Sequence, residues 1–255
     1  YDIILEKPIS MTLDETVAIG KVAEKYPDQL VAVCHVLRHT PFFSTIKQII
    51  DSKELGNVVN IQHNENVGYY HFAHSYVRGN WRNTDISAPF IVAKSCHDLD
   101  ILLYLLGGKN SVRLSSMGSL TYFKKENYDS EKMAPRCVDC SIEKTCPYSA
   151  IKIYESDLIK SVVFNKHTSE TLRKDLETSH YGKCVFNTDN NVADNQVTII
   201  EFEDGVHATF NLSAFTDKNH RSIKIMCEKG EIRATGTTKE IEVTKFGFGS
   251  KVIKP

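Results

Sequence analysis

Hydrophobic runs at the start of the chain predict a parallel sheet. Residues 1–5 are mostly apolar, and a second apolar run spans residues 30–36. Between them, Thr12 and Glu15 have the spacing of a capping box, and apolar residues follow at helical intervals. Strand, helix and strand in this order form a βαβ unit. Strands of parallel sheets are normally buried on both faces, so we expect residues 1–40 to belong to a larger sheet.

The rest of the chain reads as a helix followed by strands with period-two alternation. The helix is predicted around Ile46 to Ile50 and stops at Gly56. From Val197 onward, turn dipeptides separate the strands, which predicts an antiparallel sheet. Such a sheet keeps one face on a core and leaves the other for a ligand or a partner subunit. The alternating positions are Val59, Ile61 and His63, then Val112, Leu114, Ser116 and Gly118, and the turns are Asp204-Gly205 and Lys229-Gly230.

The stretch from about 124 to 195 is polar and poorly periodic. We interpret it as an insertion with some helix near Lys152 to Lys160. The expected fold class is α/β (α+β). A remnant of a parallel sheet in residues 1–40 is followed, in residues 41–255, by an open, mainly antiparallel β-sheet with helices on one face.

The composition of the chain limits the partners and the cellular compartment that we expect. With 31 basic against 32 acidic residues among 255, neither nucleic acid nor membrane is expected as the main partner. No apolar segment approaches the length that spans a membrane. The seven cysteines are an odd number without secretory features, which indicates reduced thiols and a cytoplasmic protein.

The first motif that carries chemistry is Glu6-Lys7-Pro8, directly after the first predicted strand. Open α/β sheets bind ligands at the carboxyl ends of their strands, so Lys7 is a candidate site residue. Pro8 restricts Lys7 to extended geometry and thereby aims its ammonium group. A Gly-x-Gly-x-x-Gly loop normally precedes such a lysine, but the sequence contains none. We therefore expect an N-terminal portion to be absent from this chain.

The second motif is a leucine-rich helix that carries His97. Ser95 and Asp98 are spaced as N-cap and N3 residues, and Gly107 is placed to end the helix. His97 would then lie in the first turn, where the positive end of the helix dipole disfavours imidazolium. A neutral ring at that place can accept a proton. Taken alone, the pattern leaves a core histidine as the alternative.

These two motifs, Glu-Lys-Pro and a His-Asp-x-Asp helix start, together resemble the Gfo/Idh/MocA family of NAD(P)-dependent sugar and polyol oxidoreductases. The resemblance covers most of the chain. It implies the tail of a Rossmann domain, then an open antiparallel sheet, with the active site between them. It also implies NAD or NADP as the cofactor, bound near Glu6, Lys7, Pro8 and Arg38. Lys7 would assist catalysis beside the nicotinamide, and His97 would be the acid/base in hydride transfer with a secondary alcohol.

One position departs from the family pattern. Many members place an aspartate four residues before the histidine, where this chain has Ala93. Lys94 is therefore a candidate to bind a substrate oxygen or carboxylate and to support catalysis, and the alternative is a solvated lysine. Ala93 also keeps a second function class open, a non-catalytic nucleotide- or sugar-binding sensor. NAD-dependent glycosidases are a further variant within the resemblance.

Residues 67–83 are rich in aromatic, histidine and arginine side chains. Aromatic faces stack on sugar C–H groups and arginines donate to hydroxyls, so Trp81 and Arg82 are predicted to bind a sugar-like substrate. The alternative is an aromatic packing loop, for instance at a subunit interface. We also expect a homo-oligomer, assembled through the antiparallel sheet.

Three cysteines, Cys137, Cys140 and Cys146, have C-x2-C-x5-C spacing, which indicates a possible structural zinc site. Tetrahedral zinc needs a fourth ligand, for which Cys184 is the first candidate, with Cys96 or a histidine behind it. The spacing does not match iron–sulfur motifs. The alternative is a loop of free thiols.

Overall fold

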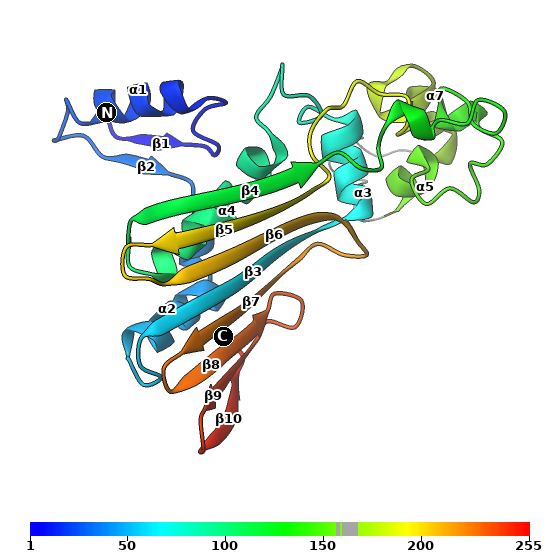
Figure 1. Cartoon of the computed structure of the whole chain (residues 1–255). Helices are drawn as coiled ribbons and strands as arrows, with labels where there is room; N and C mark the ends of the chain where they lie inside the picture. Colours follow the sequence, from blue (N-terminus) through cyan, green and yellow to red (C-terminus); the bar gives the residue numbers. More distant parts are fainter. Residues whose placement is uncertain (157–158, 160–167) are drawn as a thin grey trace.

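Two β-sheets organise the chain. The computed structural model describes residues 1–156, 159 and 168–255. A two-stranded parallel sheet is followed by an eight-stranded, mainly antiparallel one (Figure 1), which confirms the predicted fold class. The first unit contains β1 (Ile3–Leu5), α1 (Leu13–Ala23) and β2 (Val31–Val33). The second contains α2 (Pro41–Asp51), β3 (Val58–Gly68), α3 (Tyr69–Phe72), α4 (Phe90–Leu105), β4 (Ser111–Ser119), α5 (Ala150–Glu155), α7 (Ser169–Thr178), β5 (Asn195–Phe202), β6 (His207–Thr216), β7 (His220–Cys227), β8 (Gly230–Thr235), β9 (Glu240–Lys245) and β10 (Gly249–Ile253).

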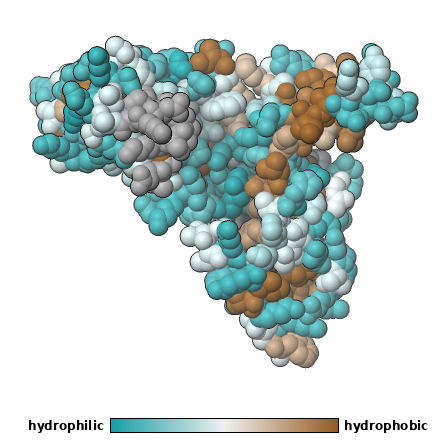
Figure 2. Space-filling model, turned by 180° about the vertical axis from the view of Figure 1, so that it is seen from behind, coloured by the Kyte–Doolittle hydropathy of each residue, from teal (hydrophilic) through white to brown (hydrophobic). Residues whose placement is uncertain are grey.

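The N-terminal unit has the predicted βαβ connectivity. β1 pairs in parallel with β2. Thr12 caps α1, because its side-chain oxygen accepts a hydrogen bond from the backbone N–H of Glu15. The expected burial of β1 is wrong for this chain, since Ile3 is 47% and Ile4 is 77% exposed. The physical reason is that two strands and one helix leave faces of the small sheet uncovered, and Figure 2 shows hydrophobic side chains gathered on this unit.

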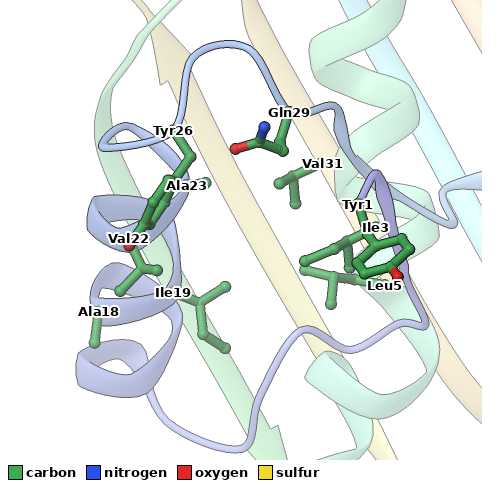
Figure 3. A pocket seen from close by; sticks show the side chains of 10 residues that line it. All are labelled: Tyr1, Ile3, Leu5, Ala18, Ile19, Val22, Ala23, Tyr26, Gln29 and Val31. Carbon is green, nitrogen blue, oxygen red and sulfur yellow. The ribbon is translucent and has the colours of Figure 1, made fainter.

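An apolar hollow of about 490 Å³ lies between α1 and the two strands of this unit. Figure 3 shows Ile19 and Val22 of α1 facing the hollow from one side and Val31 of β2 from the other. Lys7 is not among its lining residues. This hollow is therefore separate from the chemistry-bearing residues described below.

The large sheet has the order β10-β9-β8-β7-β3-β6-β5-β4. Its neighbouring strands are antiparallel except for β3 and β6, which run parallel. The two predicted hairpin turns are present, between β5 and β6 and between β7 and β8. At the first of them Gly205 has φ +77°, the left-handed region that glycine adopts without strain.

β3 is a central strand, and its buried face carries polar side chains. Ile61, His63 and Glu65 alternate toward the core and are 0%, 1% and 2% exposed. Val59 was predicted to share this face but is 52% exposed. The register between β3 and β7 shifts just after Val58, and a bulge of this kind turns the neighbouring side chain to the other face.

α4 is a buried helix that begins earlier than the sequence pattern predicts. It starts at Phe90 after Pro89, so Ser95 is an interior residue with a fully buried side chain. The predicted N-cap at Ser95 is therefore wrong, because the cap-like spacing of Ser95 and Asp98 falls inside a longer helix. The predicted end is confirmed, since α4 stops at Leu105 and Gly107 adopts φ +74°. The earlier helix, α2, is also confirmed, although it ends at Asp51, before Gly56.

The stretch predicted as an insertion contains two helices of its own. α5 covers the first part of the helix that we predicted near Lys152, and the remainder falls largely outside the described residues. α7 was not predicted. Both helices lie beyond one end of the large sheet, near α3 (Figure 1).

Helices α2 and α4 lie behind one face of the large sheet (Figure 1). On the opposite face, Val197 and Ile199 of β5 and Met117 of β4 are 42%, 47% and 70% exposed. In the part of the chain that the structure describes, no helix is long and apolar enough to cross a membrane.

Candidate active site

Lys7 joins the N-terminal unit to α4. Lys7 is the second residue after β1, and its Nζ donates a hydrogen bond to the backbone carbonyl of Ala93 at 3.0 Å. Ala93 lies one helical turn before His97, on the same helix. Lys7 also lowers the pKa of His97. The structure thus brings together Lys7 and His97, which lie ninety positions apart in the sequence.

The ring of His97 is neutral at physiological pH. Burial first, and then the positive charges of Lys7 and Arg221, lower its pKa to about 4. The predicted cause, the dipole at the start of the helix, is wrong, because His97 is the eighth residue of α4. Its Nδ1 is buried and has no partner in the described structure, and its ring stands edge-on to His35 with centroids 5.8 Å apart. A neutral imidazole of this kind can accept a proton.

Lys94 reaches toward the buried face of the large sheet. Its Nζ lies 3.4 Å from Oε1 of Glu65 on β3, and its side chain is 18% exposed. Burial raises the pKa of Glu65, and Asp98 raises it too, whereas Arg221 and Lys94 lower it. Lys94 is therefore not the solvated lysine of the alternative reading.

A network of buried charges beneath these residues was not predicted from the sequence. Asp98 of α4 accepts hydrogen bonds from Nε of Arg221 at 2.7 Å and lies 2.8 Å from Nε2 of His63. Burial alone would raise the pKa of Asp98, but His63 and Arg221 lower it to about 2. Arg221 also lies 2.9 Å from Oε2 of Glu65. The only sequence signal was the polar residues at inward positions of β3, because their partners come from distant segments.

A second neutral histidine, His71 of α3, lies near the two lysines. Burial lowers its pKa to about 4, and Lys94 and Lys7 contribute to the decrease. Its Nδ1 lies 3.0 Å from Oδ1 of Asn219, which precedes β7. Asn219 and Arg221 also line a hollow of about 410 Å³ near the start of α2, a size common among small-molecule sites. His71 belongs to the aromatic-rich stretch 67–83, but no local pattern distinguishes it from the other residues there.

Arg38, predicted to bind the cofactor, is paired with α4. Its Nε donates to Oδ2 of Asp100 at 2.7 Å, and its guanidinium lies 5.3 Å from the centre of the Tyr104 ring. The hydrogen bond to Asp100 raises the pKa of Arg38. Glu6 and Pro8 flank Lys7 after β1.

Trp81 and Arg82, predicted to bind substrate, are fixed to other parts of the chain. Arg82 donates to both carboxylate oxygens of Asp189, at 2.7 and 3.1 Å. The backbone N–H of Trp81 donates to the carbonyl of Ser75, and its side chain packs against the core. Neither residue contacts Lys7 or His97 through a hydrogen bond or ion pair that the structure describes.

The zinc prediction is not supported. Cys137, Cys140, Cys146 and Cys184 do line one small hollow, together with the buried Arg78. Among the described residues, however, no group of three or more His, Cys, Asp or Glu side chains is placed to hold a metal ion. Burial raises the pKa of Cys184 to about 11 and also raises that of Cys146, which keeps these thiols protonated. None of the seven cysteines, Cys96 included, forms a disulfide.

Comparisons with known proteins agree with this architecture. A family model described as the oxidoreductase family, C-terminal alpha/beta domain (Gfo/Idh/MocA) matches residues 47–253. The chain is 24% identical over 237 residues to "Putative oxidoreductase YteT" of Bacillus subtilis (strain 168), covering 91% of this chain and 54% of that protein. The chain thus spans about half the length of the curated relative that it matches.

Two solved structures show the same fold. Levoglucosan dehydrogenase in complex with NADH superposes with a TM-score of 0.65 at 16% identity, covering 100% of this chain and 54% of that one. An inositol dehydrogenase homolog from Azotobacter vinelandii, complexed with NADH and myo-inositol, gives a TM-score of 0.61 at 13% identity, with coverages of 99% and 49%. By its match to the family model, the chain belongs to the Gfo/Idh/MocA oxidoreductase family, of which it carries the C-terminal α/β domain.

Proposed function

We propose that this chain forms the substrate-binding part of an NAD(P)-dependent oxidoreductase. The reaction is hydride transfer between nicotinamide and a secondary alcohol of a sugar, a polyol or a related compound. The observation that carries the proposal is the contact between Lys7 and the backbone of α4, which sets an ammonium group beside a neutral histidine. Residues 1–40 would belong to the nucleotide-binding domain, and residues 41–255 to the substrate domain with its insertion at about 124–195.

In this proposal His97 takes the proton of the substrate hydroxyl. Its low pKa keeps the ring unprotonated at neutral pH, so the base is ready before the substrate arrives. Lys7 stabilises the negative charge that develops on the substrate oxygen. Lys94, held by Glu65, adds a second positive charge on the same side of the sheet. Trp81 and Arg82 would shape the substrate site from the segment before α4.

The described residues fit the nicotinamide end of such a cofactor. Lys7 lies at the carboxyl end of a parallel strand, flanked by Glu6 and Pro8, and the buried Nδ1 of His97 has no partner there. The nicotinamide supplies the hydride chemistry when it is bound. Arg38 would contribute its positive charge from its pair with Asp100.

Ala93 favours a second candidate function. An alanine offers His97 no side-chain partner, so the ring is less firmly oriented than a carboxylate would make it. A non-catalytic sensor that binds nucleotide or sugar would tolerate this. Measured turnover distinguishes the two candidates.

We also propose a homo-oligomer formed through the uncovered face of the large sheet. That face exposes Met117, Val197 and Ile199 on neighbouring strands, and adjacent exposed apolar side chains mark protein interfaces. Sedimentation analysis tests this directly, and a monomer at micromolar concentration contradicts it. We further propose that the protein is cytoplasmic, since free thiols are typical of that compartment.

The full product of the gene is the right material for the activity test. We expect NAD(P)-linked turnover of at least one polyol or sugar from a panel that includes myo-inositol and levoglucosan. His97→Ala should lower kcat by roughly a hundredfold or more, the range of general acid–base groups. His207→Ala, at an exposed histidine of β6, is the matched control and should leave kcat unchanged. An unchanged kcat in His97→Ala would remove this residue from the mechanism.

A further inference from the structure

His71 is held in one defined orientation by the structure around the end of β3. It follows β3 by three residues, and the same end of β3 carries Glu65, the partner of Lys94. Its ring Nδ1 contacts Asn219, in the connection between β6 and β7. His71 therefore lies at the point where the central strand, β7 and the lysines of the candidate site converge.

The carboxamide of Asn219 has only one orientation that satisfies its neighbours. Its Oδ1 accepts a hydrogen bond from the backbone N–H of Gly68 at 2.8 Å, and a backbone N–H can only donate. Its Nδ2 donates to the hydroxyl oxygen of Tyr70 at 3.1 Å. A Cβ at Gly68 would lie 2.7 Å from the Tyr70 ring, so a larger residue there would displace this partner of Asn219. The oxygen of Asn219, and not its nitrogen, thus faces His71.

This orientation fixes the tautomer of His71. Because Oδ1 of Asn219 is an acceptor, Nδ1 of His71 must carry the hydrogen and donate it across the 3.0 Å contact. In the neutral ring, Nε2 is then an unprotonated acceptor. No described residue makes a hydrogen bond to that Nε2, and the side chain is only partly buried.

His71 and His97 differ in a way that separates their tasks. Both are neutral and both are close enough to Lys7 for their pKa to be lowered by it. His71 has an orienting partner, whereas Nδ1 of His97 has none among the described residues. A neutral carboxamide stabilises an imidazolium less than a carboxylate does. Burial and Lys94 keep the pKa of His71 low although the bond to Asn219 raises it, so His71 is suited to accepting a hydrogen bond without taking the proton.

We propose that His71 is a specificity-determining residue, whose Nε2 accepts a hydrogen bond from a substrate hydroxyl next to the carbon that is oxidised. Lys94, which can only donate, complements it on the same substrate. The favoured substrate class is therefore a polyol or sugar with adjacent hydroxyls. This inference rests on the proposed function and deepens it.

The first test uses the full gene product with nitrogen-15-labelled histidine. The ring signals of His71, assigned by their loss in His71→Gln, should show a protonated Nδ1 and an unprotonated Nε2 at pH 7. Adding millimolar myo-inositol, levoglucosan or L-sorbose should shift the Nε2 signal for at least one of them. A protonated Nε2, or an Nε2 signal that none of the three moves, overturns the inference.

The second test separates hydroxyl recognition from a structural role. For the panel member with the highest kcat/KM, His71→Phe should lower kcat/KM by roughly tenfold, the worth of one hydrogen bond. The analogue lacking the adjacent hydroxyl should lose almost nothing. His71→Gln, whose amide oxygen can accept, should restore part of the discrimination. His74→Phe, three residues away and bound to Tyr154, is the control and should affect both compounds equally.

The outcomes distinguish this inference from the proposed function. Equal losses for the parent compound and its deoxy analogue in His71→Phe overturn the role of His71, while turnover by the wild type still supports the oxidoreductase. Absence of turnover with the whole panel contradicts the proposed function. In that case the nitrogen signals alone decide whether His71 binds a hydroxyl.

Discussion

Replacing Arg221 by methionine should cost the fold a large part of its stability. Arg221 is the only arginine that contacts both buried carboxylates of the described network, at 2.7 Å from Asp98 and 2.9 Å from Glu65. The two carboxylate side chains are 0% and 2% exposed. Breaking a buried ion pair by removing one partner costs about 3–5 kcal/mol, because a charge is left uncompensated. We expect a loss of this size for Arg221→Met at pH 7.

The assay is urea unfolding of wild type and variant, with an exposed pair as the control. Arg113 on β4 pairs with Glu201, but its side chain is 79% exposed, so Arg113→Met should cost less than about 1 kcal/mol. Equal losses of unfolding free energy in Arg221→Met and Arg113→Met, or a loss below about 1 kcal/mol for Arg221→Met, would refute the reasoning.

The same variant has a pH signature whose sign follows from the pKa of Asp98. In the wild type that pKa is about 2, below the unfolded value of about 3.9, so the carboxylate contributes stability above pH 4 that is lost as the pH falls toward 2. Without Arg221 the folded-state pKa should rise, since burial then dominates. The difference in unfolding free energy between wild type and variant should therefore shrink as the pH is lowered from 7 to 4.

Three further predictions concern pH, backbone space and Lys94. Three histidines have folded-state pKa values of about 4, below the unfolded value of about 6.5, so they bind fewer protons when folded and stability should fall between pH 6.5 and 4. These residues are His71, His74 and His97. Calorimetric melting at several pH values measures the effect, and a melting temperature that does not change with pH would contradict it. Gly182→Ala should cost at least about 2 kcal/mol in urea unfolding, because its Cβ would lie 1.8 Å from a backbone oxygen, whereas Gly20→Ala, in open space on α1, should gain up to about 1 kcal/mol. Lys94→Met should lower kcat/KM of the full gene product by roughly tenfold but cost less than about 1 kcal/mol, since Arg221 still pairs with Glu65; a large stability loss without a kinetic effect would assign Lys94 a structural role.

Most of the fold could be predicted from local sequence patterns. The βαβ unit and the hairpins were predictable because capping, alternation and turn residues act within a few positions. The start of α4 was mispredicted for a local reason as well. The spacing of Ser95 and Asp98 is that of a capping box, but the same spacing also arises inside a helix. In α4 Ser95 is buried, and Asp98 forms hydrogen bonds with side chains of β3 and β7.

The candidate site was only partly predictable, because its partners are distant in the sequence. Lys7 and His97 were identified by motif, and the structure brings them together. The pairing of Asp98 with Arg221 spans 123 positions, and that of Arg82 with Asp189 spans 107. Nothing local in the sequence indicates that Arg82 pairs with Asp189 of the insertion.

The position of β3 at the centre of the sheet has a consequence for biosynthesis. β3 ends at Gly68, but its two neighbours, β6 and β7, begin only at His207 and His220. About 140 residues therefore have to be translated before β3 can pair. At ribosomal rates of about 5–20 residues per second, this takes roughly 7 to 28 seconds.

During that interval the strand has no hydrogen-bonded neighbour, and its apolar residues can be shielded only by segments made before β6, such as α2 and α4. Long-range pairing of this kind makes folding slow and exposes strand edges to aggregation. Translation products that stop before β6 should be aggregation-prone. Slowing translation downstream of β3 should lengthen the time during which the nascent chain depends on chaperones.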